Sequence, residues 1–334
     1  MSSPPSEIPL GAMRFNSDSQ KLEYWMGSAW MQIQTFSPNL DGGSRGIFFS
    51  GSPANTNGIE FITISTQGNA IDFSDLSDSS RVQGAAAASR TRGLYAGGEN
   101  PSATDKIEFI TISIQSNASD FGDMTANRRR MNGMGCGNQT RGLFNGGYTG
   151  SSGGTVNTID LVTIASTGNG VDFGDRVAGG NSRIGTGSSP TRGVMVGSQT
   201  SPNRQIDFIT IATTGNSQDF GDSSNVGSNA AGACSATRMV YGGRLDPHNP
   251  IDFLTIATTG NSIDFGDMTV ARSSFASMSD CVRGIFAGGD GSPSQFKEID
   301  YFNIATTGDA VDFGDLPYDN QQTAGCSNGH GGLG

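Results

Sequence analysis

Histidine, cysteine and lysine are scarce in this sequence. Its 334 residues include two histidines, His248 and His330, and four cysteines. Zinc and copper centres are built from clustered His and Cys ligands, so transition-metal chemistry has little to draw on. Four cysteines in a chain of this length also do not form a disulfide scaffold. We therefore expect neither a metal ion nor a cofactor.

Positive charge is scarce too. Acidic residues outnumber basic residues by 31 to 20, which gives a net charge of −11. Such an acidic chain is a poor ligand for a phosphate backbone, and we expect no nucleic acid among its partners. The one basic cluster of the sequence is the run Arg128-Arg129-Arg130, which we interpret as a solvated turn or a local contact with a partner subunit.

Long apolar stretches are absent. No run approaches the roughly 20 apolar residues that a membrane-spanning helix needs, and residues 1–9 lack the basic start and the apolar centre of a signal peptide. Glycine, by contrast, is abundant, with 50 residues. Because Gly, Ser, Thr and Asn interrupt every stretch of about a dozen residues, long helices are excluded. These observations favour an all-β fold without membrane insertion.

Three short phrases recur through the chain at a spacing of about 48 residues. The first is an Arg, usually followed by Gly and an apolar run, at Arg45, Arg92, Arg141, Arg192, Arg238 and Arg283. The second is Ile-Asp-Phe-Ile-Thr-Ile or a close variant, beginning at Ile59, Ile107, Ile159, Ile206, Ile251 and Ile299. The third is Asp-Phe-Gly-Asp or a close variant, whose second Asp is Asp75, Asp123, Asp175, Asp222, Asp267 and Asp315. Phrases that keep step over six units establish an internal repeat.

Each unit is predicted to hold four β-strands. The second phrase carries bulky or β-branched side chains on both faces, as a strand buried between two sheets requires. Turns such as Thr214-Gly215-Asn216 lead from it into the third phrase. A strand of small residues, for example 84–89, precedes the Arg strand and is expected to be innermost. Four antiparallel strands per repeat of 40–50 residues are typical of a β-propeller blade.

The order of these strands resembles kelch repeats, in which a strand ending in Gly-Gly is followed by an apolar-acidic-aromatic strand. The resemblance covers about residues 40–334 and includes pairs such as Gly97-Gly98 and Gly288-Gly289. Phe stands where kelch blades commonly hold Trp, at Phe73, Phe121, Phe173, Phe220, Phe265 and Phe313. The resemblance implies a kelch-like β-propeller.

The two ends of the chain are predicted to form one shared blade. Residues 325–331 align with 135–142 when one position is dropped, which places His330 at a seventh Arg position. Segments 12–16, 21–25 and 29–33 are interpreted as three short strands. After a tail at 1–10, we expect a single propeller over 11–334, in which 11–33 complete the last blade with 320–334 and the repeats lie between 34 and 319. That gives seven four-stranded blades; six blades plus an N-terminal hairpin is the alternative.

The repeated Arg and Asp residues are assigned structural roles. We expect the second Asp of the third phrase to lie near the repeated Arg of the same or an adjacent blade, because bidentate Arg–carboxylate geometry would explain why Arg recurs and Lys does not. An Asp ring that binds calcium is the alternative. The cysteines are interpreted as small buried thiols near inner strands, with a disulfide between neighbouring blades as the alternative. They are Cys136, Cys234, Cys281 and Cys326.

No catalytic constellation stands out, and we expect no enzyme activity. Asp-Phe-Gly occurs five times, whereas a kinase has one such motif together with a Gly-rich loop and a His-Arg-Asp loop. No segment matches the Asp box of sialidase propellers, and a nucleophile elbow is missing. The loops that differ between units, 98–105, 147–157 and 289–296, are either recognition loops or merely tolerant connections. No ligand-binding residue is assigned.

A second resemblance concerns function. Residues 11–33 (GAMRFNSDSQKLEYWMGSAWMQI) look like a β-module of tailed-phage structural proteins, and the phrase TRG…GG…IDFxTIATTGNxxDFGD is similar to repeats in marine-phage virion proteins. The resemblance implies a virion component of the tail or tail fibre, assembled in the host cytoplasm, whose propeller binds a host-surface glycan or receptor.

Its partners would be other virion proteins, and Trp25 and Trp30 would anchor an oligomer. Two alternatives remain open. One is a purely structural or decorating subunit of tail or capsid, and the other is a cellular kelch-like carbohydrate-binding protein.

Overall fold

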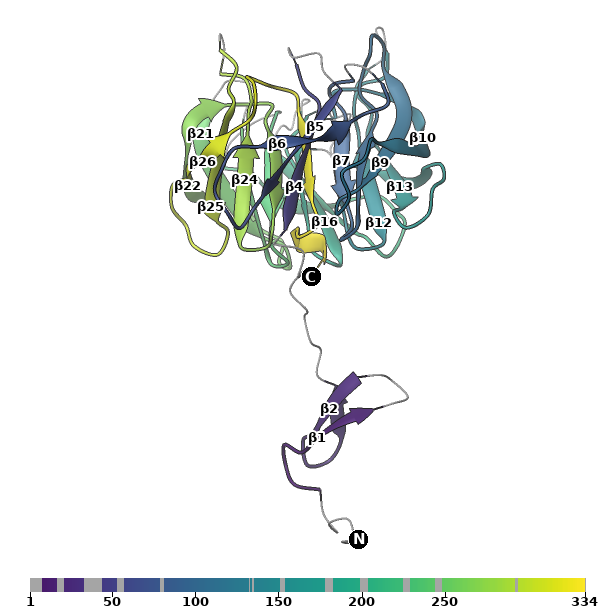
Figure 1. The fold of residues 1–334 in the computed structure, drawn as a ribbon, viewed down its shortest axis with the longest axis vertical. Helices are drawn as coiled ribbons and strands as arrows, with labels where there is room; N and C mark the ends of the chain where they lie inside the picture. Colours follow the sequence, from purple (N-terminus) through teal and green to yellow (C-terminus); the bar gives the residue numbers. More distant parts are fainter. Residues whose placement is uncertain are drawn as a thin grey trace. The chain divides into compact units, whose positions relative to one another are not determined.

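The computed structural model is all-β (Figure 1). It describes residues 8–16, 21–32, 44–52, 57–78, 81–131, 133, 135–150, 154–177, 183–198, 204–224, 229–243, 248–291 and 294–333. Within these ranges there are seven antiparallel sheets, six of four strands and one of three, and a short 3-10 turn, η1 (Gly331–Leu333). The same ranges contain no helix of the length and apolarity needed to cross a membrane.

The chain divides into two compact units, residues 1–42 and 43–334. The first unit holds the three-stranded sheet, which consists of β1 (Met13–Asn16), β2 (Lys21–Trp25) and β3 (Trp30–Gln32). Its strands pair in chain order, with Met13 opposite Tyr24 and Trp25 opposite Trp30. It is therefore a small meander with a sheet of its own.

The second unit holds the six four-stranded sheets, each a meander of consecutive strands apart from one that joins both ends of the unit. The latter consists of β27 (Ala324–Ser327), β4 (Arg45–Phe49), β5 (Gly58–Thr63) and β6 (Ile71–Asp75). The other five are β7 (Ala85–Ala88), β8 (Arg92–Ala96), β9 (Thr104–Thr111) and β10 (Ser119–Arg128); β11 (Gly135–Gly137), β12 (Arg141–Asn145), β13 (Thr158–Thr163) and β14 (Val171–Asp175); β15 (Gly185–Ser188), β16 (Arg192–Val196), β17 (Gln205–Thr210) and β18 (Gln218–Asp222); β19 (Ala231–Cys234), β20 (Arg238–Gly242), β21 (His248–Thr255) and β22 (Ile263–Arg272); and β23 (Ala276–Ser279), β24 (Arg283–Ala287), β25 (Glu298–Asn303) and β26 (Val311–Asp315).

The pairing of the two chain ends differs from the sequence-based expectation. The C-terminal strand β27 pairs with β4, with Cys326 opposite Ile47, and not with any strand of residues 11–33. The prediction that 11–33 complete a last blade with 320–334 is therefore wrong, and so is the single domain over 11–334. The physical reason is that β4 to β6 form a meander of only three strands, whose open edge at β4 accepts β27.

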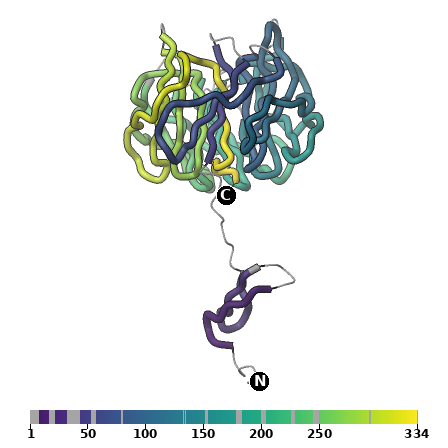
Figure 2. The backbone as a smooth tube through the Cα atoms, in the orientation of Figure 1, coloured from purple at the N-terminus to yellow at the C-terminus, as the bar shows by residue number. Residues whose placement is uncertain are grey.

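The first strands of the four-stranded sheets contact one another, and Figure 2 shows the C-terminal one (yellow) beside the segment 45–49 with which it pairs. These strands touch in the order β7, β11, β15, β19, β23 and β27, and β27 in turn touches β7. They consist of Ala, Gly, Ser, Thr and Cys apart from one Met, as predicted for innermost strands. At Gly135, a Cβ atom would lie 1.9 Å from the Ala86 carbonyl oxygen, so a side chain cannot be accommodated there. The arrangement is consistent with a β-propeller, and residues 43–334 are called the propeller unit below.

Strands with two apolar faces make the core between neighbouring sheets. On β4, Ile47 and Phe49 pack in a cluster with β7 to β9, whereas Phe48 points the other way into a cluster with β23 to β26. All three side chains are 0 or 1% exposed. The sequence-based interpretation of strands buried on both faces was made for the second phrase, and it is confirmed for β5, whose Ile59 and Ile62 lie in these same two clusters. The core of the propeller unit consists of such layers between sheets.

The third repeat phrase joins each sheet to the next one. Gly260 donates its N–H to the Phe220 carbonyl (2.8 Å), Ser262 donates to the Asp222 carbonyl (3.0 Å), and the Asn261 side chain accepts from the Asp222 N–H (3.0 Å). The bond to the carbonyl of the second Asp recurs at Asp75–Ala118, Asp123–Gly170, Asp175–Ser217, Asp267–Ala310 and Asp315–Ala70. The Thr-Gly-Asn turn and the Asp-Phe-Gly-Asp strand thus recur together because they contact each other across the sheet boundary.

The Gly of this strand is required by the same contact. Gly221 has a φ of +147°, and a Cβ atom on it would lie 2.5 Å from the Gly260 carbonyl oxygen. One sheet has Ser74 in place of this Gly. The turn that it contacts, 115–118, also has no Gly, so the two glycines are absent together. Gly260 itself has a φ of +158°, and a Cβ atom on it would have no neighbouring atom within 4 Å. A substitution at Gly260 therefore strains the backbone without adding a steric clash.

Gly221→Ala is therefore expected to destabilise the protein by about 2 kcal/mol more than Gly260→Ala, since both strain the backbone and Gly221→Ala adds a clash with main chain. The two unfolding midpoints, measured in urea on the full chain, provide the comparison. Equal losses would show that the close approach at Gly221 carries no cost.

Candidate functional site

The repeated arginines bridge neighbouring sheets through carbonyl groups. Each donates its Nη1 to the carbonyl of the Ile that ends the second phrase of the adjacent sheet. The pairs are Arg45–Ile112 (2.9 Å), Arg92–Ile164 (3.0 Å), Arg141–Ile211 (2.6 Å), Arg192–Ile256 (3.1 Å), Arg238–Ile304 (3.0 Å) and Arg283–Ile64 (3.2 Å). Five of the six guanidinium groups also stack on an aromatic ring of their own sheet, as Arg238 does on Phe253 at 4.3 Å. A planar cation suits both contacts, which lysine could not make together.

The prediction that these arginines pair with the second Asp of the third phrase is wrong. Within the described ranges, no ion pair joins a repeated Arg to the second Asp of the third phrase. Asp315 instead pairs with Lys297 (3.2 Å). The repeated Asp residues act mainly through their backbone groups at the sheet boundary, so the fixed position reflects main-chain geometry.

Buried Arg–carboxylate pairs do occur, but they are formed by other residues. The acidic residue of the second phrase is buried in every sheet: Glu60, Glu108, Asp160, Asp207, Asp252 and Asp300. Four of them pair with an Arg from the segment that enters the sheet, namely Arg81–Glu108 (2.6 Å), Arg128–Asp160, Arg176–Asp207 (2.9 Å) and Arg272–Asp300 (2.7 Å). These eight side chains are 0 or 1% exposed. Arg128 is therefore not part of a solvated turn, as its place in the basic run suggested.

The remaining two buried acids have hydroxyl partners. Glu60 accepts a hydrogen bond from the Tyr318 hydroxyl, and Asp252 accepts from Tyr241 (3.3 Å) and Ser224. Burial, opposed by the Tyr318 hydrogen bond, raises the pKa of Glu60 to about 7. Sequence reasoning missed all of these partners; the four arginines follow the repeated Asp at irregular distances, which hides them from a search at fixed spacing.

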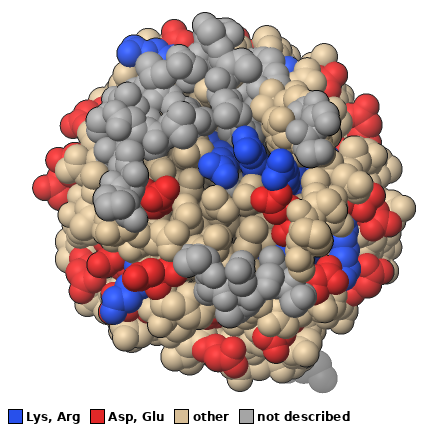
Figure 3. Space-filling view, turned by 90° about the horizontal axis from the view of Figure 1, so that it is seen from above, with Lys and Arg blue, Asp and Glu red and all other residues tan. Residues whose placement is uncertain are grey.

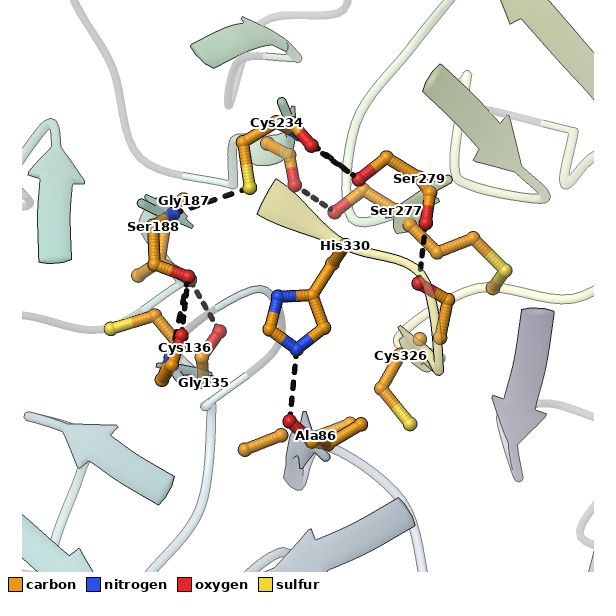
Figure 4. A pocket seen from close by; sticks show the side chains of 18 of the residues that line it. Ala86, Gly135, Cys136, Gly187, Ser188, Cys234, Ser277, Ser279, Cys326 and His330 are labelled. Atoms are coloured by element: carbon orange, nitrogen blue, oxygen red, sulfur yellow. Dashed lines mark hydrogen bonds between the residues drawn. The ribbon is translucent and has the colours of Figure 1, made fainter. Parts of the chain in front are cut away.

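A cavity of about 50 Å³ lies at the centre of the propeller unit (Figure 4). It is lined by residues of all six first strands, and its volume is enough for one or two water molecules. Neighbouring strands are tied there by side-chain hydroxyls: Ser188 donates to the Gly137 carbonyl (2.7 Å), and Ser279 donates to the Cys234 carbonyl (2.7 Å).

Three of the four cysteines line this cavity on different sheets, which confirms their predicted place. Cys136, Cys234 and Cys326 are buried, while Cys281 follows β23 and is partly buried. All four thiols are free. Burial raises the pKa of Cys136 to about 12 and that of Cys281 to about 11, so these sulfurs remain protonated and unreactive at neutral pH.

His330 covers one end of the cavity. Its Nδ1 accepts from the Gly332 N–H (3.1 Å), so its Nε2 carries the proton and donates to the Ala88 carbonyl (2.9 Å). Arg90 reaches the Leu333 carbonyl (3.0 Å), which holds the turn η1 beneath the first strands. Burial lowers the pKa of His330, because a cation there would be poorly solvated. The other histidine, His248, begins β21.

Backbone hydrogen bonds encircle the other end of the cavity. Each sheet contributes one residue with positive φ before its first strand, and these residues are called the backbone ring: Gln83, Arg130, Arg183, Asn229, Ser274 and Gln322. The N–H groups donate to carbonyls as Gln83–Gln322 (3.3 Å), Gln322–Ser274 (2.8 Å), Ser274–Asn229 (3.1 Å), Asn229–Arg183, Arg183–Arg130 (2.9 Å) and Met131–Gln83 (2.9 Å). The bonds thus pass through all six sheets and return to the first.

The loops that differ between units lie beside this ring. Glu99 pairs with Val82, Tyr148 with Arg129, and Asp290 with Ser273, each in a β-bridge next to a ring residue. Glu99 belongs to the loop 98–105, Tyr148 to 147–157 and Asp290 to 289–296, of which 151–153 and 292–293 are outside the described residues. The described parts of these three loops, which are either recognition loops or tolerant connections, therefore lie at one end of the cavity, which Figure 3 shows from above.

No group of three or more metal-ligating side chains with metal-site geometry occurs in the parts of the chain that the structure describes. Comparison with known proteins adds no assignment: no protein-family model matches the chain, and no curated protein is detectably similar to it. Function must therefore be argued from the geometry itself.

Proposed function

We propose that the protein is a non-enzymatic subunit of a phage tail or tail fibre, made of an assembly module (residues 1–42) and a six-bladed, kelch-like propeller that binds the host surface. Support for six blades comes from the cyclic contacts of the first strands and from the backbone ring, both of which return to their start. The six Arg-to-carbonyl bonds support the same closure, because Arg283 reaches back to Ile64.

The observation that carries the assembly role is the apolar face of the three-stranded sheet. Strand alternation places Met13, Phe15, Leu22, Tyr24 and Met31 on this face. Met13 and Phe15 are 62% and 66% exposed, and Tyr24 and Met31 are exposed as well. A three-stranded sheet without a covering layer cannot bury a core alone, and exposed apolar patches mark interaction sites.

The side chains on the opposite face of this sheet contact one another. Glu23 is buried between Arg14 and Asn16, and its carboxylate accepts from both at 2.9 Å. The Asn16 and Arg14 hydrogen bonds lower the pKa of Glu23 despite its burial. Trp25 and Trp30 pack on each other at 5.5 Å, and Arg14 lies 4.2 Å above the Trp30 ring. The two tryptophans predicted to anchor a neighbour therefore contact each other, and the apolar face is the better candidate for that contact.

Virions assembled with a chain carrying Phe15→Ser and Met31→Ser are expected to lack this protein, whereas Ile114→Ser with Val282→Ser should be incorporated normally. The control pair is comparably exposed, at 60% and 59%, but lies on the propeller unit.

Cryo-EM of the particles then locates the protein. A propeller exposed on the tail supports host binding, while one enclosed by other subunits favours the purely structural role. Absence of the wild-type chain from purified virions contradicts the proposal.

A further inference from the structure

Basic side chains gather at the ring end of the cavity although the chain as a whole is acidic (Figure 3). Arg129, Arg130 and Arg183, called the arginine cluster below, are half-buried there. Arg130 and Arg183 are neighbours in the backbone ring, and the charge of Arg130 contributes, after burial, to lowering the pKa of Arg183. The carboxylates of Glu99 and Asp290 oppose this effect on Arg183. An anion bound at the cluster would reduce the remaining repulsion between the guanidinium groups.

One guanidinium of the cluster is uncommitted. Arg129 forms an ion pair with Glu99. Arg130, in contrast, lies 4.9 Å from the centre of the Tyr148 ring and, among the described residues, has no side-chain hydrogen bond or ion pair. Its Nε is buried, so its two Nη groups remain for an external carboxylate, which they can bind in a bidentate manner.

A buried acceptor lies in the same ring. Gln83 is 7% exposed, and its amide nitrogen donates to Glu99 (2.7 Å) and to Gln322 (3.0 Å). Its amide oxygen is buried and has no hydrogen-bond partner among the residues that the structure describes. A buried acceptor without a donor is unfavourable by about 1–3 kcal/mol, so this oxygen is suited to a hydroxyl or N–H group of a ligand.

We propose that the ring end of the propeller binds an acidic saccharide, with its carboxylate on Arg130 and a neighbouring hydroxyl directed at the Gln83 amide oxygen. The proposal rests on the proposed host-surface role and specifies its ligand class. Uncharged polar residues, Asn229, Ser274 and Gln322, complete the ring, which suits hydroxyl groups around a single acid. A peptide with several acidic residues would instead meet the field of a chain of net charge −11.

The test is a calorimetric titration of the full chain at low ionic strength with sialyllactose and with digalacturonate as acidic probes. Lactose is the matched neutral sugar, and tetraglutamate is the acidic peptide. We expect both acidic saccharides to bind and lactose to bind at least about tenfold more weakly, since a charge-assisted bidentate contact is lost. Arg130→Gln should weaken acidic binding at least about tenfold.

Arg204→Gln is the control, because it removes the same charge from an exposed arginine outside the ring and should change the affinity less than about twofold. Equal losses of affinity in Arg130→Gln and Arg204→Gln would show that only the overall charge of the protein matters, and would overturn the proposed site. Tighter binding of tetraglutamate, or no binding of either acidic saccharide, would overturn the ligand class. Either result leaves incorporation into virions through residues 1–42 unaffected, so the two proposals fail separately.

Discussion

Replacing Asp300 by Ala is expected to destabilise the protein by about 3–5 kcal/mol, because it leaves the guanidinium of Arg272 buried without its counter-charge. The pair is 2.7 Å long, and both side chains are at most 1% exposed. Asp300 also accepts from the Thr269 hydroxyl (2.6 Å), which would lose its partner. Urea unfolding of the full chain measures the loss.

Two comparisons separate the buried charge from lost packing. Lys297→Ala breaks a pair that is 47% and 36% exposed, and it should cost less than about 1 kcal/mol. Asp300→Leu combined with Arg272→Met removes both charges and should recover much of the loss. A single substitution Asp300→Ala that costs no more than Lys297→Ala would contradict the role assigned to these pairs.

The stability of the protein is expected to fall as the pH rises from 5 to 8, and Glu60→Gln should abolish much of that decline. Within the described ranges Glu60 has no arginine partner, and its pKa of about 7 in the folded state lies above the usual 4.5. The folded protein therefore retains this proton over a range in which the unfolded chain has lost it. The resulting stabilisation is complete below pH 4.5 and is lost as the pH passes 7.

The difference in pKa corresponds to about 3 kcal/mol at most between the two ends of this range. Thermal unfolding of the wild type and of Glu60→Gln at pH 5, 6, 7 and 8 tests it, because the difference between the two proteins removes the contribution of all other titrating groups. Parallel curves would show that Glu60 ionises in the folded state as readily as an exposed carboxyl.

The sequence predicted what repeats at constant spacing. The four strands of each unit, the small residues of the first strands and the sheet-bridging arginines all occur at nearly fixed intervals, and the structure contains each of them. The partner of Arg192 could not be found in this way, because it is the backbone carbonyl of Ile256. Every residue has a backbone carbonyl, so the sequence does not indicate which one accepts the bond.

The buried Arg–acid pairs illustrate a second limit. Arg176 follows Asp175 directly, whereas Arg81 comes six residues after Asp75, yet both reach the equivalent acid of the next sheet. Segments of different length can deliver a guanidinium to one place, so no fixed spacing reveals the pairs. The pairing of β27 with β4 was missed for a related reason: alignment recognised the strand but not which open edge would accept it.

The sheet that contains both β27 and β4 has a consequence for how the molecule reaches its folded state. Asn328 accepts a hydrogen bond from the Arg45 N–H across a sequence separation of 283 residues. During synthesis, the strands β4 to β6 must therefore wait with one edge unpaired until β27 has been made. Such non-local pairing slows folding, and an unpaired edge exposes the nascent chain to association with its neighbours. Pairing of β27 thus completes this sheet, and the time before it pairs is when the chain is most vulnerable to aggregation.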